Sequence, residues 1–231
     1  MKALFMPAVY NEKISLGKEI IEKLPLKVGL AASVQFVGQL GMIKKEIESI
    51  KNESLLKKSI NKENNKTIRN KKAIIAGQIL GCNVKNAEKI ANKVDAFLYI
   101  GDGDFHPLAI ALKINKPVYQ YNPLNKEFKK ISEEEINKIK KNQKVSYVKF
   151  LHADNVGIII STKPGQHYPI EKTNSLIKRL ENKYKNKKFY TFICDNVDER
   201  EFENFNFIQA WVNTACSRIT GKNIVNVEEV K

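Results

Sequence analysis

The architecture of this chain depends on the segment Asp95-Ala96-Phe97-Leu98-Tyr99-Ile100-Gly101-Asp102-Gly103-Asp104-Phe105-His106-Pro107. Its first half is an almost unbroken apolar run, which is typical of a strand buried on both faces of a parallel sheet. Its second half is a loop of glycine and aspartate, and open α/β sheets bind ligands beyond the carboxyl ends of their strands. The segment therefore predicts a parallel sheet with a binding site where this strand ends.

A second segment, Gly77-Gln78-Ile79-Leu80-Gly81-Cys82-Asn83, places a thiol in a turn between glycines. Glycines here predict a sharp bend of the backbone or a close approach to a ligand. A helix is predicted from about 84 to 93, and a thiol before a helix N-terminus tends to have a lowered pKa. Cys82 is therefore a candidate reactive or metal-binding thiol, and its alternative interpretation is a buried thiol in a tight turn.

Short apolar strands alternate with helical patterns along the rest of the chain. Strands are predicted at 27–33, 96–100, 117–121, 156–161 and 188–194, and helices from Gln35 onward, at 108–112, at 128–141 and at 170–183. This alternation predicts an α/β fold of two consecutive similar units with mainly parallel sheets, residues 27–124 with Cys82 and residues 125–231 with Cys216. The Lys- and Asn-rich stretch 52–72 is expected to be a solvated connection.

The first 26 residues are expected to be a remnant strand and a linker helix. Residues 2–9 form an apolar strand pattern with no sheet of their own, which suggests the last strand of a preceding domain outside this sequence. Residues 15–23 show the spacing of a short amphipathic helix that ends before Pro25.

Composition favours a globular protein of the cytoplasm. The chain has 231 residues, and 40 Lys and Arg against 25 Asp and Glu give it a formal charge of +15. No apolar run reaches the roughly 18 residues of a membrane span, and the N-terminus shows no signal-peptide pattern. The charge favours anionic partners, but it is spread along the chain, so nucleic-acid binding stays an alternative rather than a conclusion.

The three cysteines are expected to be reduced, since they cannot all pair within one chain. Cys216 has Arg218 as a nearby positive charge, whereas Cys194 ends a strand and is better explained as a core thiol. Two thiolates are too few for a zinc or iron–sulfur site. A further ligand would come from Cys194, from another chain, or from a histidine, of which the sequence has His106, His152 and His167.

Two loops are candidates for binding a carboxylate. His106 could bind a substrate carboxylate or transfer a proton, although a hydrogen-bonded structural histidine is the commoner case. Residues 162–166, Thr-Lys-Pro-Gly-Gln, could bind an anion through backbone amides or form an ordinary type II turn.

Several motifs, in this order, resemble those of a known family. They are Gly77 to Asn83, Ile100 to Pro107, Tyr119-Gln120-Tyr121-Asn122-Pro123, Ser161 to Gln166 and Asn213-Thr214-Ala215-Cys216-Ser217-Arg218-Ile219. They are similar to motifs of the archaeal diphthamide synthase subunit, the 2-(3-amino-3-carboxypropyl)histidine synthase family of noncanonical radical S-adenosylmethionine enzymes. The resemblance covers roughly residues 27 to 220.

The resemblance implies a three-domain α/β enzyme, usually a homodimer, in which each domain gives one cysteine to a [4Fe–4S] cluster. Cys82 matches the second-domain ligand and Cys216 the third-domain ligand. The open iron would bind S-adenosylmethionine, whose 3-amino-3-carboxypropyl group is transferred as a radical to C2 of a histidine of translation elongation factor 2. We expect the pocket for S-adenosylmethionine or substrate to be formed by Gln35, Gly101, Asp102, Gly103, His106, Gly165 and Gln166.

The sequence departs from the family pattern in two respects. The first domain and its cysteine are missing, and Ser217 stands where the family usually has proline; Cys194 has no counterpart among the ligands. We therefore expect a separate N-terminal-domain polypeptide to supply the third cysteine, in a homodimer or heteromer, so that this chain is the C-terminal part of a split enzyme. Two alternatives stay open: a non-catalytic cluster-binding subunit, and a nucleotide- or nucleic-acid-binding α/β protein without iron.

Overall fold

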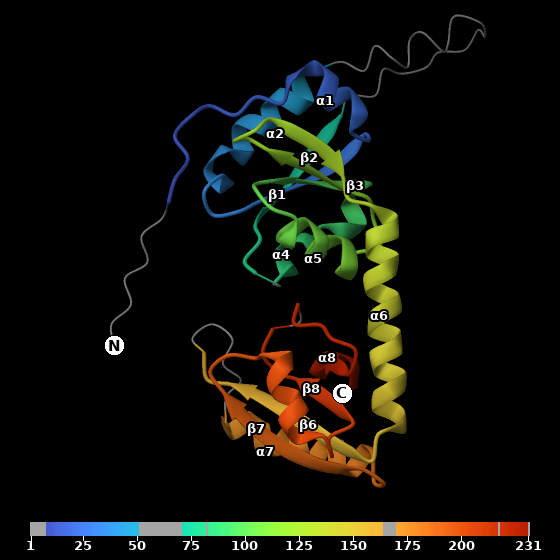
Figure 1. The fold of residues 1–231 in the computed structure, drawn as a ribbon. Helices are drawn as coiled ribbons and strands as arrows, with labels where there is room; N and C mark the ends of the chain where they lie inside the picture. The colour runs from blue at the N-terminus through green and yellow to red at the C-terminus, as the bar shows by residue number, and fades with distance from the viewer. Residues whose placement is uncertain (1–7, 51–70, 82, 164–169, 217, 231) are drawn as a thin grey trace, which may run out of the picture. The chain divides into compact units, whose positions relative to one another are not determined.

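The computed structural model describes residues 8–50, 71–81, 83–163, 170–216 and 218–230, which form two compact units, Met1–Ile136 and Asn137–Lys231 (Figure 1). The boundary lies later than the predicted 124/125. Strand β5 (Glu127–Lys130) explains the difference, because it pairs with β4 (Val118–Asn122) of the first unit and so belongs to that sheet.

The first unit is built on a five-stranded sheet. Its strand order is β2-β1-β3-β4-β5, in which β1 to β4 are parallel and β5 is antiparallel. The remaining strands are β1 (Lys27–Ala32), β2 (Lys72–Gln78) and β3 (Ala96–Ile100). Every residue of β3 is buried, as its unbroken apolar run predicted.

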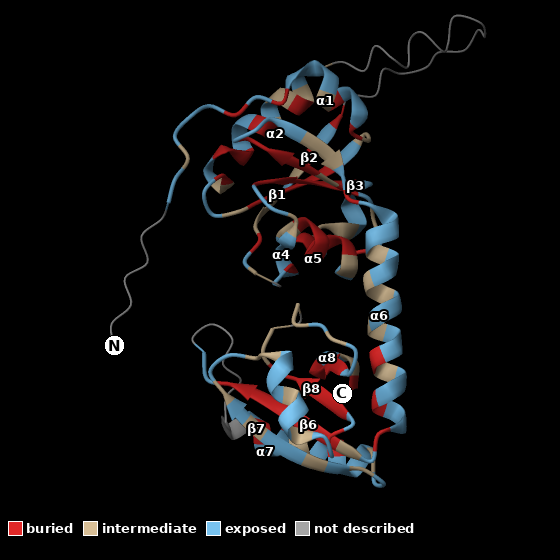
Figure 2. Ribbon diagram, in the orientation of Figure 1, coloured by how far each residue is buried: buried red, intermediate tan, exposed pale blue. Residues whose placement is uncertain are grey.

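Helices cover both faces of this sheet (Figure 1). On one face lie α1 (Gly17–Lys23), the short η1 (Val37–Gln39) and α2 (Leu40–Ser49), and on the other α4 (Lys85–Glu88), η2 (Ala91–Lys93) and α5 (Phe105–Lys113). Alternate strand residues point to opposite faces. Leu30 and Leu98 therefore pack against Ile43 of α2 in one buried cluster, which appears red in Figure 2.

Two predictions for this unit needed correction. The helix predicted over 128–141 starts later, as α6 (Glu133–His152), because a tight turn with Lys126 at φ 59° folds β5 back onto β4. The Phe128 ring stacks on Tyr119 with 5.7 Å between centroids, which fixes this hairpin. Strand β2 was not predicted, although its residues 73–76 are apolar.

The second unit repeats this plan with four parallel strands. The order is β7-β6-β8-β9, with β6 (Asn155–Ser161), β7 (Lys188–Cys194), β8 (Ala210–Asn213) and β9 (Ile224–Asn226). One face packs against Phe150 of α6, α7 (Ile170–Lys183) and α8 (Val227–Val230). The other face packs Trp211 against aromatic residues of η3 (Glu199–Phe205).

A shared glycine marks the repeat. Gly29 is the third residue of β1 and Gly157 the third residue of β6, and each faces an aromatic residue of its unit's third parallel strand, Phe97 or Trp211. The aromatic ring occupies the space that a side chain at the glycine would need. The predicted fold class, two similar α/β units with mainly parallel sheets, is confirmed.

Other predictions fall partly outside the described residues. The strand predicted over 2–9 lies almost wholly outside them, as does most of the connection 52–72, whereas the predicted helix near 15–23 is α1. Within the described part of the chain, no helix has the length and apolar character needed to cross a membrane.

Candidate cofactor and substrate site

The first unit has a topological switch point between β1 and β3, because the connection after β1 leads to β2 on one side and the connection after β3 leads to β4 on the other. Open α/β sheets bind ligands at such a point. The backbone N–H of Ser33, after β1, donates to the carbonyl of Ile100 at the end of β3, 3.2 Å away. The loops that carry Gln35 and Gly101 therefore start side by side.

A buried tyrosine holds His106 at this edge. The Tyr99 hydroxyl lies 2.8 Å from Nδ1 of His106, which is the second residue of α5. Gly101 is required beside this pair, because an added Cβ would lie 2.7 Å from the Tyr99 hydroxyl. The imidazole thus has a fixed orientation at the switch point, and it is held there by Tyr99, a residue for which the sequence predicted no role.

Because the Tyr99 phenol is buried, we expect the free energy of unfolding to fall at high pH. Burial raises its pKa to about 12, and the charge of Asp102 adds to this while Ser33 opposes it. An unfolded tyrosine loses its proton near pH 10, so above that pH the unfolded state binds fewer protons than the folded state and stability falls. The contribution, on the order of 3 kcal/mol, is complete below pH 10 and lost as the pH rises through 12.

We expect the free energy of unfolding of Tyr99→Phe to fall less steeply with pH, between pH 10 and 12, than that of the parent protein. Denaturant unfolding of both proteins from pH 9 to 12 measures the difference. Equal slopes for the variant and the parent would contradict the assignment.

Two amide side chains of β4 brace the Gly/Asp loop. Gln120, 3% exposed, donates from Nε2 to the carbonyls of Gly101 (3.2 Å) and Gly103 (3.0 Å). Asn122 donates from Nδ2 to Oδ1 of Asp102 at 2.8 Å, which also accepts from the N–H of Gly103. Both amides lie in a motif that carried the family resemblance, yet no functional role was predicted for them.

The second unit has its switch point between β6 and β8, and Cys216 lies in the loop after β8. Buried Asn213 ties this loop down: its Nδ2 donates to the carbonyl of Cys216 (2.7 Å) and to Oδ1 of Asn226 (3.0 Å). Its Oδ1 accepts from the N–H of Ala215 at 2.9 Å. Two of these three hydrogen bonds of Asn213 fix the backbone around a half-buried thiol, and the third anchors the amide to β9.

The other described thiol, Cys194, has a different environment. It is the last residue of β7, pairs in register with Ser161, and packs against the apolar cluster around Trp211. Burial raises the pKa of the Cys194 thiol, and the charge of Asp195 raises it further, so the metal-binding thiolate form is disfavoured. This agrees with the prediction that Cys194 is a core thiol.

The described residues fit a shared cluster only in part. Among them, no three His, Cys, Asp or Glu side chains gather closely enough to hold a metal ion. Cys82, Gly165 and Gln166 lie outside the described residues, as does His167, while exposed His152 ends α6. The glycines flanking the Cys82 turn have positive φ angles, 98° at Gly77 and 56° at Gly81, as their pattern suggested.

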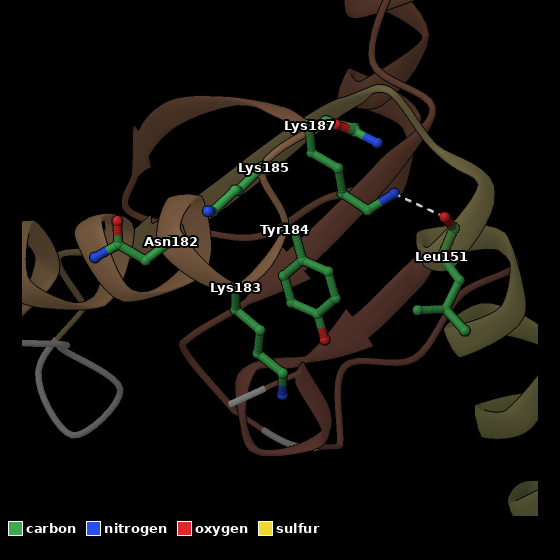
Figure 3. A pocket seen from close by; sticks show the side chains of 7 residues that line it. Leu151, Asn182, Lys183, Tyr184, Lys185 and Lys187 are labelled. Atoms are coloured by element: carbon green, nitrogen blue, oxygen red, sulfur yellow. Dashed lines mark hydrogen bonds between the residues drawn. The ribbon is translucent and has the colours of Figure 1, made fainter.

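A hollow of about 520 Å³ lies at the opposite edge of the second sheet, where β7 begins (Figure 3). It is lined by Lys183, Lys185 and Lys187 among others. Lys187 donates to the carbonyl of Leu151 at 2.8 Å and Lys183 to that of Val230 at 3.3 Å. Two of the three ammonium groups therefore bond the protein's own backbone, which weakens the case for a polyanion site.

Comparison with known proteins decides the family. Residues 4–225 match the family model described as "Putative diphthamide synthesis protein". The chain belongs to this family. The motifs that carried the resemblance in the sequence are thus explained by common descent within the diphthamide synthesis family.

Two relatives are named 2-(3-amino-3-carboxypropyl)histidine synthase. The protein of Methanocaldococcus jannaschii is 38% identical over 143 residues, which are 61% of this chain and 39% of the relative. That of Pyrococcus horikoshii is 28% identical over 220 residues, 94% of this chain and 58% of the relative. This chain therefore spans about half the length of these relatives.

A solved structure shares the fold. The crystal structure of Dph2 from Pyrococcus horikoshii with a 4Fe-4S cluster superposes with a TM-score of 0.65 at 25% sequence identity, covering 91% of this chain and 57% of that one. An iron–sulfur cofactor is thus present in a protein similar to this one in both sequence and fold.

Proposed function

We propose that this chain takes part in the first step of diphthamide biosynthesis. The reaction transfers the 3-amino-3-carboxypropyl group of S-adenosylmethionine to C2 of a histidine imidazole in translation elongation factor 2. The observation that carries the proposal is Cys216, a thiol whose loop is fixed at the switch point of its sheet, in a family with a cluster-containing member.

Cys82 and Cys216, one from each unit, would each be a ligand of a [4Fe–4S] cluster. A third cysteine ligand would come from a separate polypeptide, because Cys194 does not suit the role. When bound, the cluster would supply one electron that breaks the bond between the sulfonium and the 3-amino-3-carboxypropyl group and so generates the radical.

The chain's own residues would bind and orient the reactants. The switch-point loops with Gln35, Gly101, Asp102, Gly103 and His106 would hold S-adenosylmethionine or the substrate loop, with Tyr99 fixing His106. Gly165 and Gln166, after β6, are proposed to bind in the same way from the second unit. The chain would work in the cytoplasm, as a homodimer or heteromer with the third-cysteine polypeptide, and its +15 charge would favour contact with acidic surfaces.

A transfer assay tests this proposal. The chain and its candidate partner polypeptide are reconstituted without oxygen, reduced with dithionite, and mixed with S-adenosylmethionine and elongation factor 2. Mass spectrometry should show one 3-amino-3-carboxypropyl group on the target histidine, and none without dithionite. Iron without any cleavage of S-adenosylmethionine would indicate a non-catalytic cluster-binding subunit, and salt-sensitive polyanion binding without iron would indicate the nucleic-acid alternative; both contradict the proposal.

A further inference from the structure

The Gly/Asp loop of the first unit borders a small recess that is rich in hydrogen-bond acceptors. The recess has a volume of about 150 Å³ and is lined by Asp102, Gly103, Asp104, Gln120, Asn122, Asn125, Glu127 and Lys129. These residues come from the loop after β3, from β4 and from the β4–β5 hairpin. Three carboxylates against one ammonium give it a net charge of −2, in a chain whose total is +15.

The existing cation does not neutralise the recess. Lys129 Nζ lies 2.8 Å from Oδ1 of Asp104, and this contact raises the pKa of the Lys129 ammonium. Asp102 accepts hydrogen bonds from the N–H of Gly103 and from Nδ2 of Asn122, and Glu127 accepts from Nδ2 of Asn125, all of which are neutral groups. Lys129 also interacts with the charge of Glu127. The charge of Asp102 therefore lacks a cationic partner among the described residues, and the recess keeps its net charge of −2.

A buried acceptor points to the same chemistry. Nε2 of Gln120 donates to the carbonyls of Gly101 and Gly103. These two bonds identify the nitrogen of the amide, so its other terminal atom is the acceptor Oε1. Gln120 Oε1 is buried and has no hydrogen-bond partner among the described residues. A buried acceptor that is left unpaired destabilises the protein, and a ligand that brings N–H donors would offset this cost.

The repeat gives an independent reason to expect a ligand here. Gly29 pairs in register with Phe97, and Gly157 pairs with Trp211. Asp102 lies five residues after Phe97, and Cys216 lies five residues after Trp211. Asp102 thus holds the position in the first unit at which the second unit presents its thiol.

The amide brace is repeated as well. Gln120 pairs with Tyr99 on β3, and Asn226 pairs with Asn213 on β8, so both amides occupy the same position of the fourth strand. In each unit this amide helps to hold the loop after the third strand. We infer that the recess beside Asp102 binds a primary ammonium group, with Asp102 and Glu127 supplying charge and Gln120 Oε1 an acceptor.

The source of this ammonium group follows from chemistry. If the proposed function holds, the natural ligand is the amino-acid end of S-adenosylmethionine, which is also the part that is transferred. A lysine side chain of a protein partner carries the same group. A divalent metal ion is disfavoured, because no three metal-binding side chains among the described residues, the carboxylates of this recess included, lie close enough together to hold one.

Nuclear magnetic resonance of the ¹⁵N-labelled full chain tests the inference, with three probes. S-adenosylhomocysteine carries the amino-acid end, 5′-methylthioadenosine lacks it, and Nα-acetyl-lysine amide carries only a side-chain ammonium. We expect S-adenosylhomocysteine to shift the Gly103 amide and the Gln120 side-chain amide to saturation, and 5′-methylthioadenosine to leave both unshifted. A stronger response to acetyl-lysine amide would assign the recess to a protein lysine and still support an ammonium site.

Matched variants locate the effect. Glu127→Gln should weaken binding about two- to fivefold, the range expected for a partly exposed charge pair. Glu134→Gln makes the same charge change on α6, away from the recess, and should leave the affinity unchanged. Three results would overturn the inference. The two variants could lose affinity equally, or no probe could shift the two amides. Binding could also occur only in Lys129→Met, which would make the Lys129 ammonium the occupant of the recess. Binding by iron-free protein would uphold it even if the proposed function fails.

Discussion

Replacing Cys216 by alanine is expected to reduce the visible iron–sulfur absorbance of the reconstituted protein at least about tenfold, the loss that even outer-shell changes can cause at metal sites. The expected loss is this large because a [4Fe–4S] cluster with three cysteine ligands has no spare thiolate. Asn213, which is itself bonded to Asn226, holds the backbone carbonyl of Cys216. Because this backbone is fixed, a neighbouring group cannot easily move into the position of the missing thiol. Anaerobic absorption spectra of equal protein amounts measure the effect.

Cys194→Ala is the matched control, since it removes a thiol from the same unit. Its absorbance should equal that of the parent protein, because the Cys194 thiol is held among apolar side chains with a raised pKa. The opposite pattern, in which Cys194→Ala loses the absorbance and Cys216→Ala keeps it, would contradict our assignment of the ligands.

Gly157→Ala is expected to lower the free energy of unfolding of the second unit by about 1–3 kcal/mol, the usual cost of overpacking a core. An alanine Cβ at this position would lie 2.4 Å from Cε3 of Trp211. The indole cannot move away freely, because the ring of Phe202 stacks on it with centroids 4.3 Å apart. Urea unfolding followed by tryptophan fluorescence measures the change, since Trp211 is the only tryptophan in the chain.

Gly221→Ala provides the comparison within the same unit. Its Cβ would come even closer to another group, 2.1 Å from Oε1 of Glu199, but this is the end of an exposed and flexible side chain. The carboxylate can rotate away, so we expect a change within about 0.5 kcal/mol. Equal destabilisation by the two substitutions would show that the Gly157–Trp211 contact is not the rigid element of the sheet that we infer.

Much of the fold could be predicted from sequence because its strands are short and almost wholly apolar. The predicted limits of β3, β7 and α7 agree with the structure to the residue. The three-residue strand β9 is too short to give a periodic signal, and it was missed. Phe128 was assigned to a helix because the acidic helix start at Glu133 follows closely, whereas its packing on Tyr119 is a tertiary contact that no local pattern reveals.

Candidate site residues could be predicted where the residue type itself indicates a chemical role, as for cysteine, histidine and the Gly/Asp loop. Residues that act only by positioning others could not be predicted in this way. This holds for Gln120 and Asn213, because an amide in a strand has no chemical signature until the strands that pair with it are known. The correspondence of Asp102 with Cys216 likewise required the register of both sheets.

The most direct test of our central claim is the iron and acid-labile sulfide content of the protein reconstituted without oxygen, alone and with its candidate partner polypeptide. We expect about four iron and four sulfide per assembled site with the partner present, as in a [4Fe–4S] cluster, and substoichiometric amounts in the chain alone. A protein that stays free of iron in both preparations would contradict the proposed function, and a fully loaded cluster in the chain alone would contradict the need for a third ligand from another polypeptide.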